Sequence, residues 1–380
     1  MSERGTPSVG RASPPAAGHL RMKRGTTIPL GVLVLCLAGG AYLARGEIGV
    51  ALMRRVARNS IFNDTIGALP DGLHVGLCGT GSPFPSPTRS GPCTAIVAGS
   101  RLFIVDTGRG SADIIARMGL QSDRIEAVLL THFHSDHIDG LGQLGELHWL
   151  AGSAATPLVV IGPSGVERVV GGFNEVHAQN GAYRTAHHGP DIAAPSGFGL
   201  VAHPFEIPDG DSSVVILDRD DLRITAFNVN HEPVRPAVGY RFDYKGRSIV
   251  VSGDTAKSSN LVRVSTGADV LVHEARSPRL VGVLEEAARA SGHTAPAHLF
   301  HDTASYHTSP SDAADEASQA HVHALVFTHF IPPVPMGSLE GPFLGDARQH
   351  FSGPLLVGRD GDLFSLLAVG GELSRRNLLD

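Results

Sequence analysis

Short apolar runs alternate with amphipathic stretches along the chain from residue 73 onward. Runs rich in β-branched and aromatic residues predict strands, and apolar positions three or four apart predict helices. The strands are expected over 73–77, 94–97, 102–105, 224–229, 270–273 and 324–328, with a hairpin over 238–251 around Lys245-Gly246. Helices are expected over 112–118, 166–177 and 311–320, the last after the capping pair Ser309-Pro310. Because no repeat of 20 to 50 residues is visible, residues 72–370 are interpreted as one domain of mixed α and β elements.

The N-terminal region has a different pattern. Residues 1–24 are rich in Gly, Ser, Pro and Arg and have little to bury, which predicts a disordered tail. The uncharged stretch 25–44 is just long enough to span a bilayer and follows several basic residues, so we predict a transmembrane anchor. A cleaved signal segment and a buried core helix are the alternatives. With 45–71 as a linker, this predicts a membrane-anchored catalytic domain outside the cytoplasm, periplasmic or extracellular, or secreted if the segment is cleaved.

Composition narrows the class of protein. With 380 residues, 42% of them hydrophobic, the chain can bury a large core, as a globular enzyme does. The net charge is −6, only three residues are lysine, and no basic run lies in the body of the chain. The usual electrostatic footprint of a tight nucleic-acid binder is therefore missing. Cys78 and Cys93 could form a disulfide, but two cysteines do not make a framework, so unpaired thiols are expected.

A dense group of metal-competent side chains follows the apolar run 127–130. The segment His132-Phe133-His134-Ser135-Asp136-His137 contains three imidazoles and a carboxylate, the donors that zinc and its borderline neighbours take. In an extended segment, positions 132 and 134 share one side, while Asp136 and His137 can turn toward a second metal. We therefore predict a metal site at the end of a strand.

Three more strand ends lead to a donor. His231 follows 225–230, Asp254 follows 248–253 and His329 follows 324–328, so all three are expected at the same end of a sheet. A di-metal centre needs about three donors per metal and a bridging carboxylate. The assignment places His132, His134 and His231 on one metal and Asp136, His137 and His329 on the other, with Asp254 bridging.

The order His-x-His-x-Asp-His, His, Gly-Asp-Thr and Thr-His resembles the metallo-β-lactamase superfamily over roughly residues 72–367. The resemblance implies an α/β fold, an αββα sandwich with a di-metal site at one edge. Segments 79–82, 105–108, 273–275 and 307–309 are similar to the branch that contains ribonuclease Z and related phosphodiesterases and arylsulfatases. True β-lactamases of the superfamily take a cysteine ligand after the first motif, and here all three cysteines precede it.

Two departures from ribonuclease Z argue against tRNA as the substrate. Bacterial enzymes of that type carry an arm rich in Gly and Lys/Arg, whereas residues 163–208 here carry little positive charge. They also usually show Gly-Glu-Gly where this chain has Gly108-Arg109-Gly110. The expected function is a di-zinc hydrolase that uses a metal-bridging hydroxide on a phosphodiester or a similar anionic ester. The alternatives are a ribonuclease Z-type endoribonuclease acting on tRNA 3′ ends, or an arylsulfatase, lactonase or thioesterase; a non-catalytic metal-binding module ranks last.

The resemblance also suggests catalytic roles. Two Zn²⁺ ions, or Mn²⁺ or Fe²⁺ in their place, would lower the pKa of a bridging water, and Asp136 could accept its proton. His307 matches the position of the branch's proposed general acid, which protonates the leaving alkoxide. The partner is expected to be a small anionic ester, with nucleic acid not favoured, the membrane contacted through the N-terminal segment, and a homodimer left open. Solvated loop positions are expected for His187, His188, His203, His293, His298 and His301, and a structural role for His273-Glu274.

Overall fold

The computed structural model describes residues 1, 5, 30–57 and 63–380. They separate into two compact units, Met1–Val56 and Ala57–Asp380. The first unit contains helices α1 (Leu30–Leu43) and α2 (Arg45–Val56), so a helix begins inside the stretch 45–71 that was predicted to be a linker. The predicted disordered tail over 1–24 lies outside the described residues, apart from Met1 and Gly5.

Helix α1 covers residues 30–43 of the predicted anchor. Within residues 30–57 and 63–380, no helix is long and apolar enough to cross a membrane. The part of the stretch 25–44 that the structure describes therefore does not support the predicted transmembrane anchor, and residues 25–29 lie outside it.

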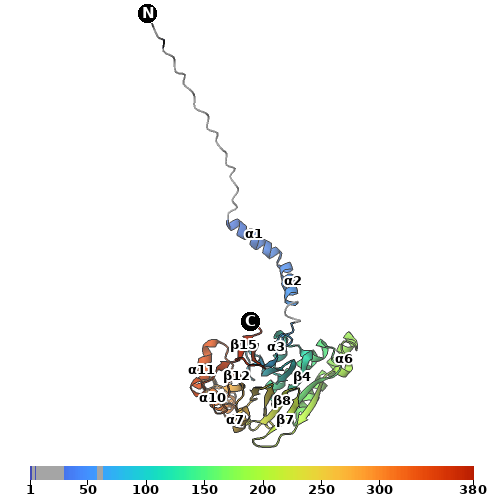
Figure 1. Ribbon diagram of the computed structural model, residues 1–380, viewed down its shortest axis with the longest axis vertical. Coiled ribbons are helices and arrows are strands. Elements are labelled where there is room, and N and C mark those ends of the chain that lie inside the picture. Colours follow the sequence, from blue (N-terminus) through green and yellow to red (C-terminus); the bar gives the residue numbers. More distant parts are fainter. Residues whose placement is uncertain (2–4, 6–29, 58–62) are drawn as a thin grey trace. The chain divides into compact units, whose positions relative to one another are not determined.

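The second unit is built on two β-sheets (Figure 1). The eight-stranded sheet has the order β15-β14-β1-β2-β3-β4-β5-β6 and the seven-stranded sheet the order β13-β12-β11-β10-β9-β8-β7. The strands of the first sheet are β1 (Gly72–Gly79), β2 (Cys93–Ala98), β3 (Arg101–Val105), β4 (Ile125–Leu129), β5 (Leu158–Pro163), β6 (Leu200–Phe205), β14 (Asp362–Leu367) and β15 (Ser374–Asn377). Those of the second are β7 (Ser213–Arg219), β8 (Leu222–Asn228), β9 (Val238–Tyr244), β10 (Arg247–Val251), β11 (Val270–Arg276), β12 (Ala324–Ile331) and β13 (Leu355–Val357).

Three apolar clusters define the layers. One fills the space between the sheets, with Leu73, Phe103 and Leu129 from the first sheet against Phe242 and Val272 from the second. The second cluster packs helices on the outer face of the first sheet, and the third does the same for the second sheet. In Figure 1, α6 and α10 accordingly lie at opposite sides of this unit. These layers form the αββα sandwich that the resemblance implies.

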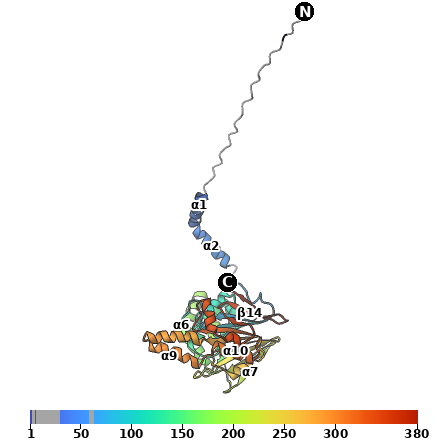
Figure 2. The same ribbon diagram turned by 90° about the vertical axis from the view of Figure 1, so that its left-hand side faces the viewer.

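The helices differ from the predicted ones mainly in extent. They are α3 (Ser111–Arg117), α4 (Ser135–Ile138), α5 (Leu141–Ala151), α6 (Val166–His188), α7 (Ser259–Ser265), α8 (Pro278–Ala290), α9 (Thr294–Asp302), α10 (Pro310–Gln319), α11 (Glu340–Leu344) and α12 (Ala347–His350). Helix α6 continues well beyond the predicted end at residue 177. The helical pair α8 and α9, drawn in orange in Figure 2, projects from the side of the second unit and was not predicted.

Cys78 and Cys93 form a disulfide between the neighbouring strands β1 and β2. The prediction of unpaired thiols is therefore wrong. The pairing of β1 with β2 is irregular between Leu77 and Gly79, and this bulge brings the two Cα atoms to 4.9 Å, within the usual range for a disulfide. A local register shift of this kind cannot be read from cysteine spacing.

The two sheets are joined by hydrogen bonds at the start of the histidine-rich segment. The buried hydroxyl of Tyr240 donates to the carbonyl of Leu130 at 2.6 Å, and Val238 N donates to Thr131 O at 3.0 Å. Tyr240 and Val238 belong to β9 in the second sheet, whereas residues 130 and 131 follow β4 in the first. These bonds hold the exit of β4 against the opposite sheet.

We predict that Tyr240→Phe lowers the free energy of unfolding by about 1 to 2 kcal/mol, because it removes the donor from a buried bond. Urea unfolding monitored by circular dichroism measures the change. Tyr183→Phe is the control, since Tyr183 is 59% exposed and its loss should fall within about 0.5 kcal/mol. Equal stabilities of the two variants would contradict a stabilising role for the Tyr240 hydroxyl.

Candidate metal centre

One carboxylate organises the loop that carries the first histidines. Asp106 follows β3 in the left-handed conformation, with φ of 58°. Its Oδ1 accepts from Thr131 N at 2.9 Å, and its Oδ2 accepts from Thr131 Oγ1 at 2.8 Å and from His137 Nδ1 at 2.9 Å. Asp106 thus holds both ends of the segment from 131 to 137. The sequence marked this residue only as part of a family-like segment and assigned it no role.

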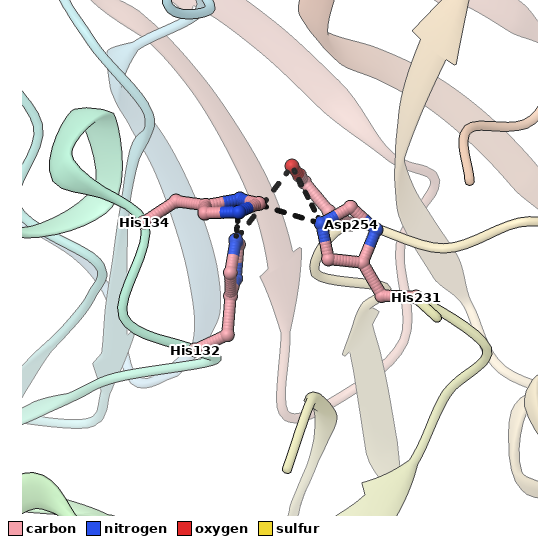
Figure 3. Close-up of side chains that lie close together, drawn as sticks. All are labelled: His132, His134, His231 and Asp254. Atoms are coloured by element: carbon pink, nitrogen blue, oxygen red, sulfur yellow. Dashed lines mark hydrogen bonds and ion pairs between the residues drawn. The ribbon is translucent and has the colours of Figure 1, made fainter. Parts of the chain in front are cut away.

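The first group of donors comprises His132, His134, His231 and Asp254 (Figure 3). One ligand atom from each lies within 4.8 Å of the others. His134 Nδ1 is 3.0 Å from His132 Nε2 and 3.4 Å from His231 Nε2. His132 and His134 come from one loop and His231 and Asp254 from two others, and the side chains point toward one another, as the close-up shows.

The second group comprises Asp136, His137 and His329. The short helix α4 begins at Ser135 and turns Asp136 and His137 back toward the centre. His329 lies in a bulge of β12, where Thr328 pairs with Glu274 and Phe330 with Ala275. The φ of His329 is 46°, which is uncommon for a residue other than glycine and typical of strained functional positions.

Asp254 lies between the two groups. Its Oδ2 is 3.3 Å from the Nε2 atoms of both His137 and His329, and 3.9 Å and 4.0 Å from those of His132 and His231. Burial alone would raise the pKa of Asp254, but the charges of His329 and His137 hold it well below its usual range. The carboxylate is therefore ionised and can be shared by two cations.

Hydrogen bonds orient three of the imidazoles. The Nδ1 atom of His132 donates to Thr131 Oγ1 at 3.0 Å, that of His137 to Asp106, and that of His231 to the carbonyl of Tyr306 at 2.9 Å. Each bond leaves the Nε2 lone pair free to face the centre, as second-shell bonds do in metal sites. His137 Nε2 is buried and has no hydrogen-bond partner within the part of the chain that the structure describes. A buried nitrogen in this state fits a divalent cation.

His307 lies beside both groups. Its ring centroid is 5.3 Å from that of His231 and 5.5 Å from that of His329, which it stacks on. Its Nδ1 is 3.3 Å from Glu274 Oε1, and the same oxygen accepts from Thr308 N at 2.8 Å. One ligand atom of His307 also lies within 4.8 Å of ligand atoms of Asp254 and His329. The geometry therefore allows a role in proton transfer or as an additional metal ligand.

His273 and Glu274 do more than form a structural loop, because both contact charged or titratable side chains. Both lie in β11 and are fully buried, and Glu274 contacts His307 directly. His273 Nε2 is 3.3 Å from Glu316 Oε2 on α10. Burial opposes the charged form of His273, but Glu316 and Glu274 raise its pKa overall. The sequence contained the signal, a carboxylate after a buried strand, but gave no means of pairing it with His307.

The remaining histidines named from the sequence lie apart from the centre. They are exposed on α6, on β6 or on the α8–α9 pair, and comprise His187, His188, His203, His293, His298 and His301. Trp149 is buried and donates to Ala194 O at 2.8 Å, whereas His148 Nδ1 lies 3.0 Å from Ser122 O. None of these residues belongs to the donor groups found within the described residues.

A cavity of about 400 Å³ opens beside His231. Four carboxylate side chains line it, against the single guanidinium of Arg235, and they belong to Glu206, Asp209, Asp211 and Glu232. The field in this cavity therefore favours neutral or cationic groups over anions.

Comparisons with known proteins agree with this geometry. A family model described as "Beta-lactamase superfamily domain" matches residues 101–330. Ribonuclease Z of Mycobacterium bovis (strain BCG / Pasteur 1173P2) is 36% identical over 290 residues, which cover 76% of this chain and 96% of that protein.

Two crystal structures share the fold. A metallo-β-lactamase fold protein from Bacillus subtilis is 19% identical with a TM-score of 0.56, and the alignment covers 78% of this chain and 100% of that chain. The short form of human tRNase Z is 21% identical with a TM-score of 0.55, over 76% of this chain and 98% of that chain.

The expected location is corrected by the same findings. It depended on a membrane-spanning segment, and no helix in the described residues can span a membrane. The relatives that match are proteins named ribonuclease Z, and they do not support a domain held outside the cytoplasm or secreted. The family prediction, in contrast, is confirmed. The chain belongs to the metallo-β-lactamase superfamily and is a metal-dependent hydrolase related to ribonuclease Z.

Proposed function

We propose that this chain is a phosphodiesterase of the ribonuclease Z type, which cleaves RNA precursors at the 3′ ends of tRNA. The observation that carries the proposal is 36% identity to a ribonuclease Z over 96% of that protein's length. This reverses the order expected from the sequence, in which a small anionic ester came first. The weakly basic segment 163–208, which argued against tRNA, forms the end of β5, helix α6 and strand β6.

A small phosphodiester is the second candidate substrate. The acidic cavity beside His231 would repel an RNA strand that entered it, whereas a compact ester with a neutral or cationic group would be tolerated there. Both candidates require the same bond cleavage at the same centre. They differ in what must be bound around the scissile phosphate.

The donor groups suggest how two cations would be held. We infer that His132, His134 and His231 hold one and Asp136, His137 and His329 the other, with Asp254 shared. Imidazole-rich sets with carboxylates suit zinc, and Mn²⁺ or Fe²⁺ would also be accepted. Bound divalent cations would supply Lewis-acid stabilisation of phosphoryl oxygens and activate water for attack.

Asp136 would orient the attacking water. Its side chain is 13% exposed, the largest value in the second group, and it lies 3.3 Å from His329 Nε2. Burial raises the pKa of Asp136, but His137 and His329 lower it overall, so the carboxylate is ionised at neutral pH. It can therefore accept a hydrogen bond from water and receive its proton.

His307 would donate a proton to the leaving oxygen. Glu274 would act as the positioning residue, since its Oε1 lies 3.3 Å from His307 Nδ1, and an ion pair at that position would direct the opposite ring nitrogen, Nε2, away from Glu274. Thr308 N fixes the same carboxylate oxygen at 2.8 Å, so the position of Glu274 is itself determined by the backbone. An imidazolium held in this way would carry its Nε2 proton to the alkoxide.

We predict about two zinc-like ions per purified chain, and a clear loss of both metal and activity in Asp254→Ala, because that residue lies between the two groups. Elemental analysis by mass spectrometry gives the stoichiometry. His187→Ala, at the exposed end of α6, is the control and should retain both ions. Full metal content and activity in Asp254→Ala would show that the two cations do not share Asp254 as a ligand.

We predict that His307→Ala lowers turnover by about 10² to 10⁴ while metal content is kept, since a general acid acts on the leaving group. The loss should shrink for p-nitrophenyl esters, whose leaving group needs no proton. Steady-state kinetics on esters of graded leaving-group pKa measure the trend. His298→Ala, on a side chain that is 76% exposed, is the control. Metal loss in His307→Ala would instead identify His307 as a ligand.

The substrate is tested with the full chain on a tRNA precursor and on a panel of small esters. We expect cleavage of a tRNA precursor at the 3′ end of its tRNA portion, together with slower hydrolysis of bis(p-nitrophenyl) phosphate, thioesters, lactones and aryl sulfates. Gel analysis of end-labelled RNA and a colorimetric assay supply the two rates. Rapid hydrolysis of small esters without any RNA cleavage would overturn the ribonuclease assignment and favour the second candidate.

A further inference from the structure

A second large cavity, of about 530 Å³, has the opposite charge to the one beside His231. It is lined by the segment from Ser86 to Ser90, by residues around α3, and by Asp360 and Leu379. Three of its lining residues are arginines, Arg89, Arg109 and Arg117. Ser86, Thr88 and Ser90 add hydroxyl groups, which can donate to phosphate oxygens.

Two of the charged side chains in this cavity, Arg89 and Asp360, are already held by neighbouring residues. Arg89 is 8% exposed, its Nη1 donates to Thr80 Oγ1 and Gly358 O, and its guanidinium lies over the Phe330 ring. Asp360 is engaged as well, because its two oxygens accept from Thr80 and from Ser90 N.

The other two arginines are exposed. Neither Arg109 nor Arg117 has an ion-pair or side-chain hydrogen-bond partner among residues 30–57 and 63–380. Two guanidinium groups are therefore available to an anion, and each can present two parallel N–H donors to a phosphate.

The segment that carries Arg109 packs on the loop of the metal centre. Thr107 N donates to His137 O at 2.8 Å, and Gly140 N donates to Thr107 O at 2.7 Å. Gly108 is so close that an added Cβ would lie 2.4 Å from Asp136 O. Arg109 is the next residue, so its position is set by the same backbone that positions Asp136 and His137. A ligand that reaches Arg109 therefore lies beside the catalytic loop.

We propose that the pocket formed by Arg109, Arg117 and the hydroxyls of 86–90 binds backbone phosphates of the RNA strand that the metal centre cleaves. This inference rests on the proposed function. The arginine pocket favours a polyanion, whereas the four carboxylates beside His231 disfavour one. We therefore expect the RNA strand to extend from the metal centre past Arg109 and away from the cavity beside His231. Arg109 and Arg117 add positive charge outside the segment 163–208, which carries only two arginines and no lysine.

The test compares the full-length protein with Arg109→Ala/Arg117→Ala. The probe is a fluorescein-labelled product RNA that lacks the scissile bond, and anisotropy gives the Kd over a range of salt concentrations. Each lost phosphate contact should reduce the salt slope by about one, so the double variant should lose about two and bind at least about tenfold more weakly. Arg109→Lys/Arg117→Lys should recover most of the binding. Arg223→Ala is the control, because Arg223 is exposed and pairs with Asp218 on the other sheet.

Cleavage rates separate this inference from the proposed function. The double variant should lose at least about tenfold more kcat/KM on the tRNA precursor than on bis(p-nitrophenyl) phosphate, with metal content preserved. If the double variant lost equal kcat/KM on the two substrates, or bound RNA as tightly as Arg223→Ala does, the assignment of the arginine pocket as an RNA-binding site would be wrong. If the unaltered protein binds product RNA through the arginines but cleaves no RNA, the proposed function fails, and what remains of the inference is RNA binding at the arginine pocket.

The last experiment uses inorganic phosphate as a competitor, because a free phosphate ion and the phosphates of an RNA backbone can bind the same groups. We expect it to compete with the RNA only at concentrations well above the Kd of the RNA. Phosphate binding as tight as that of RNA and equally dependent on Arg109 and Arg117 would identify a small-anion site and contradict the RNA-backbone assignment.

Discussion

Burying a nitrogen or oxygen atom that has no hydrogen-bond or metal partner is unfavourable, and this constraint governs how the side chains of the metal centre are arranged. Five imidazoles and two carboxylates converge from four strand ends at one edge of the sandwich. Their Nδ1 atoms find partners in three cases, which leaves lone pairs directed inward. Because metal ions bind deprotonated donors, cation binding would replace protons in this cluster and stabilise the folded state. The surrounding structure positions those donors.

The support for the site extends through both sheets. Asp106, after β3, holds the loop that follows β4, and Tyr240 of the opposite sheet holds the exit of β4 itself. The bulge in β12 turns His329 out of the regular pairing. A change in any of these contacts would displace donors without removing one. This arrangement links the packing of the sandwich to the chemistry at its edge.

Much of this could be predicted from the sequence because its signals are local. Apolar runs located the inner strands, and the donor that follows each run identified the shared edge. What the sequence missed depends on contacts between distant segments. The disulfide needed a bulge between β1 and β2, and the pairing of Glu274 with His307 needed β11 beside the loop before α10. The anchor prediction rested on length and lack of charge alone, and no helix in the described residues is long and apolar enough to cross a membrane. The substrate order changed because 36% identity to a ribonuclease Z over 96% of that protein's length outweighs the low positive charge of the segment 163–208.

We propose that two cations share Asp254 at this edge. The decisive measurement is a crystal structure of the zinc-loaded protein, with anomalous diffraction recorded on both sides of the zinc absorption edge. We expect two peaks about 3.5 to 4 Å apart, one among His132, His134 and His231 and the other among Asp136, His137 and His329, with Asp254 contacting both. A single peak, or two peaks that Asp254 does not join, would contradict it.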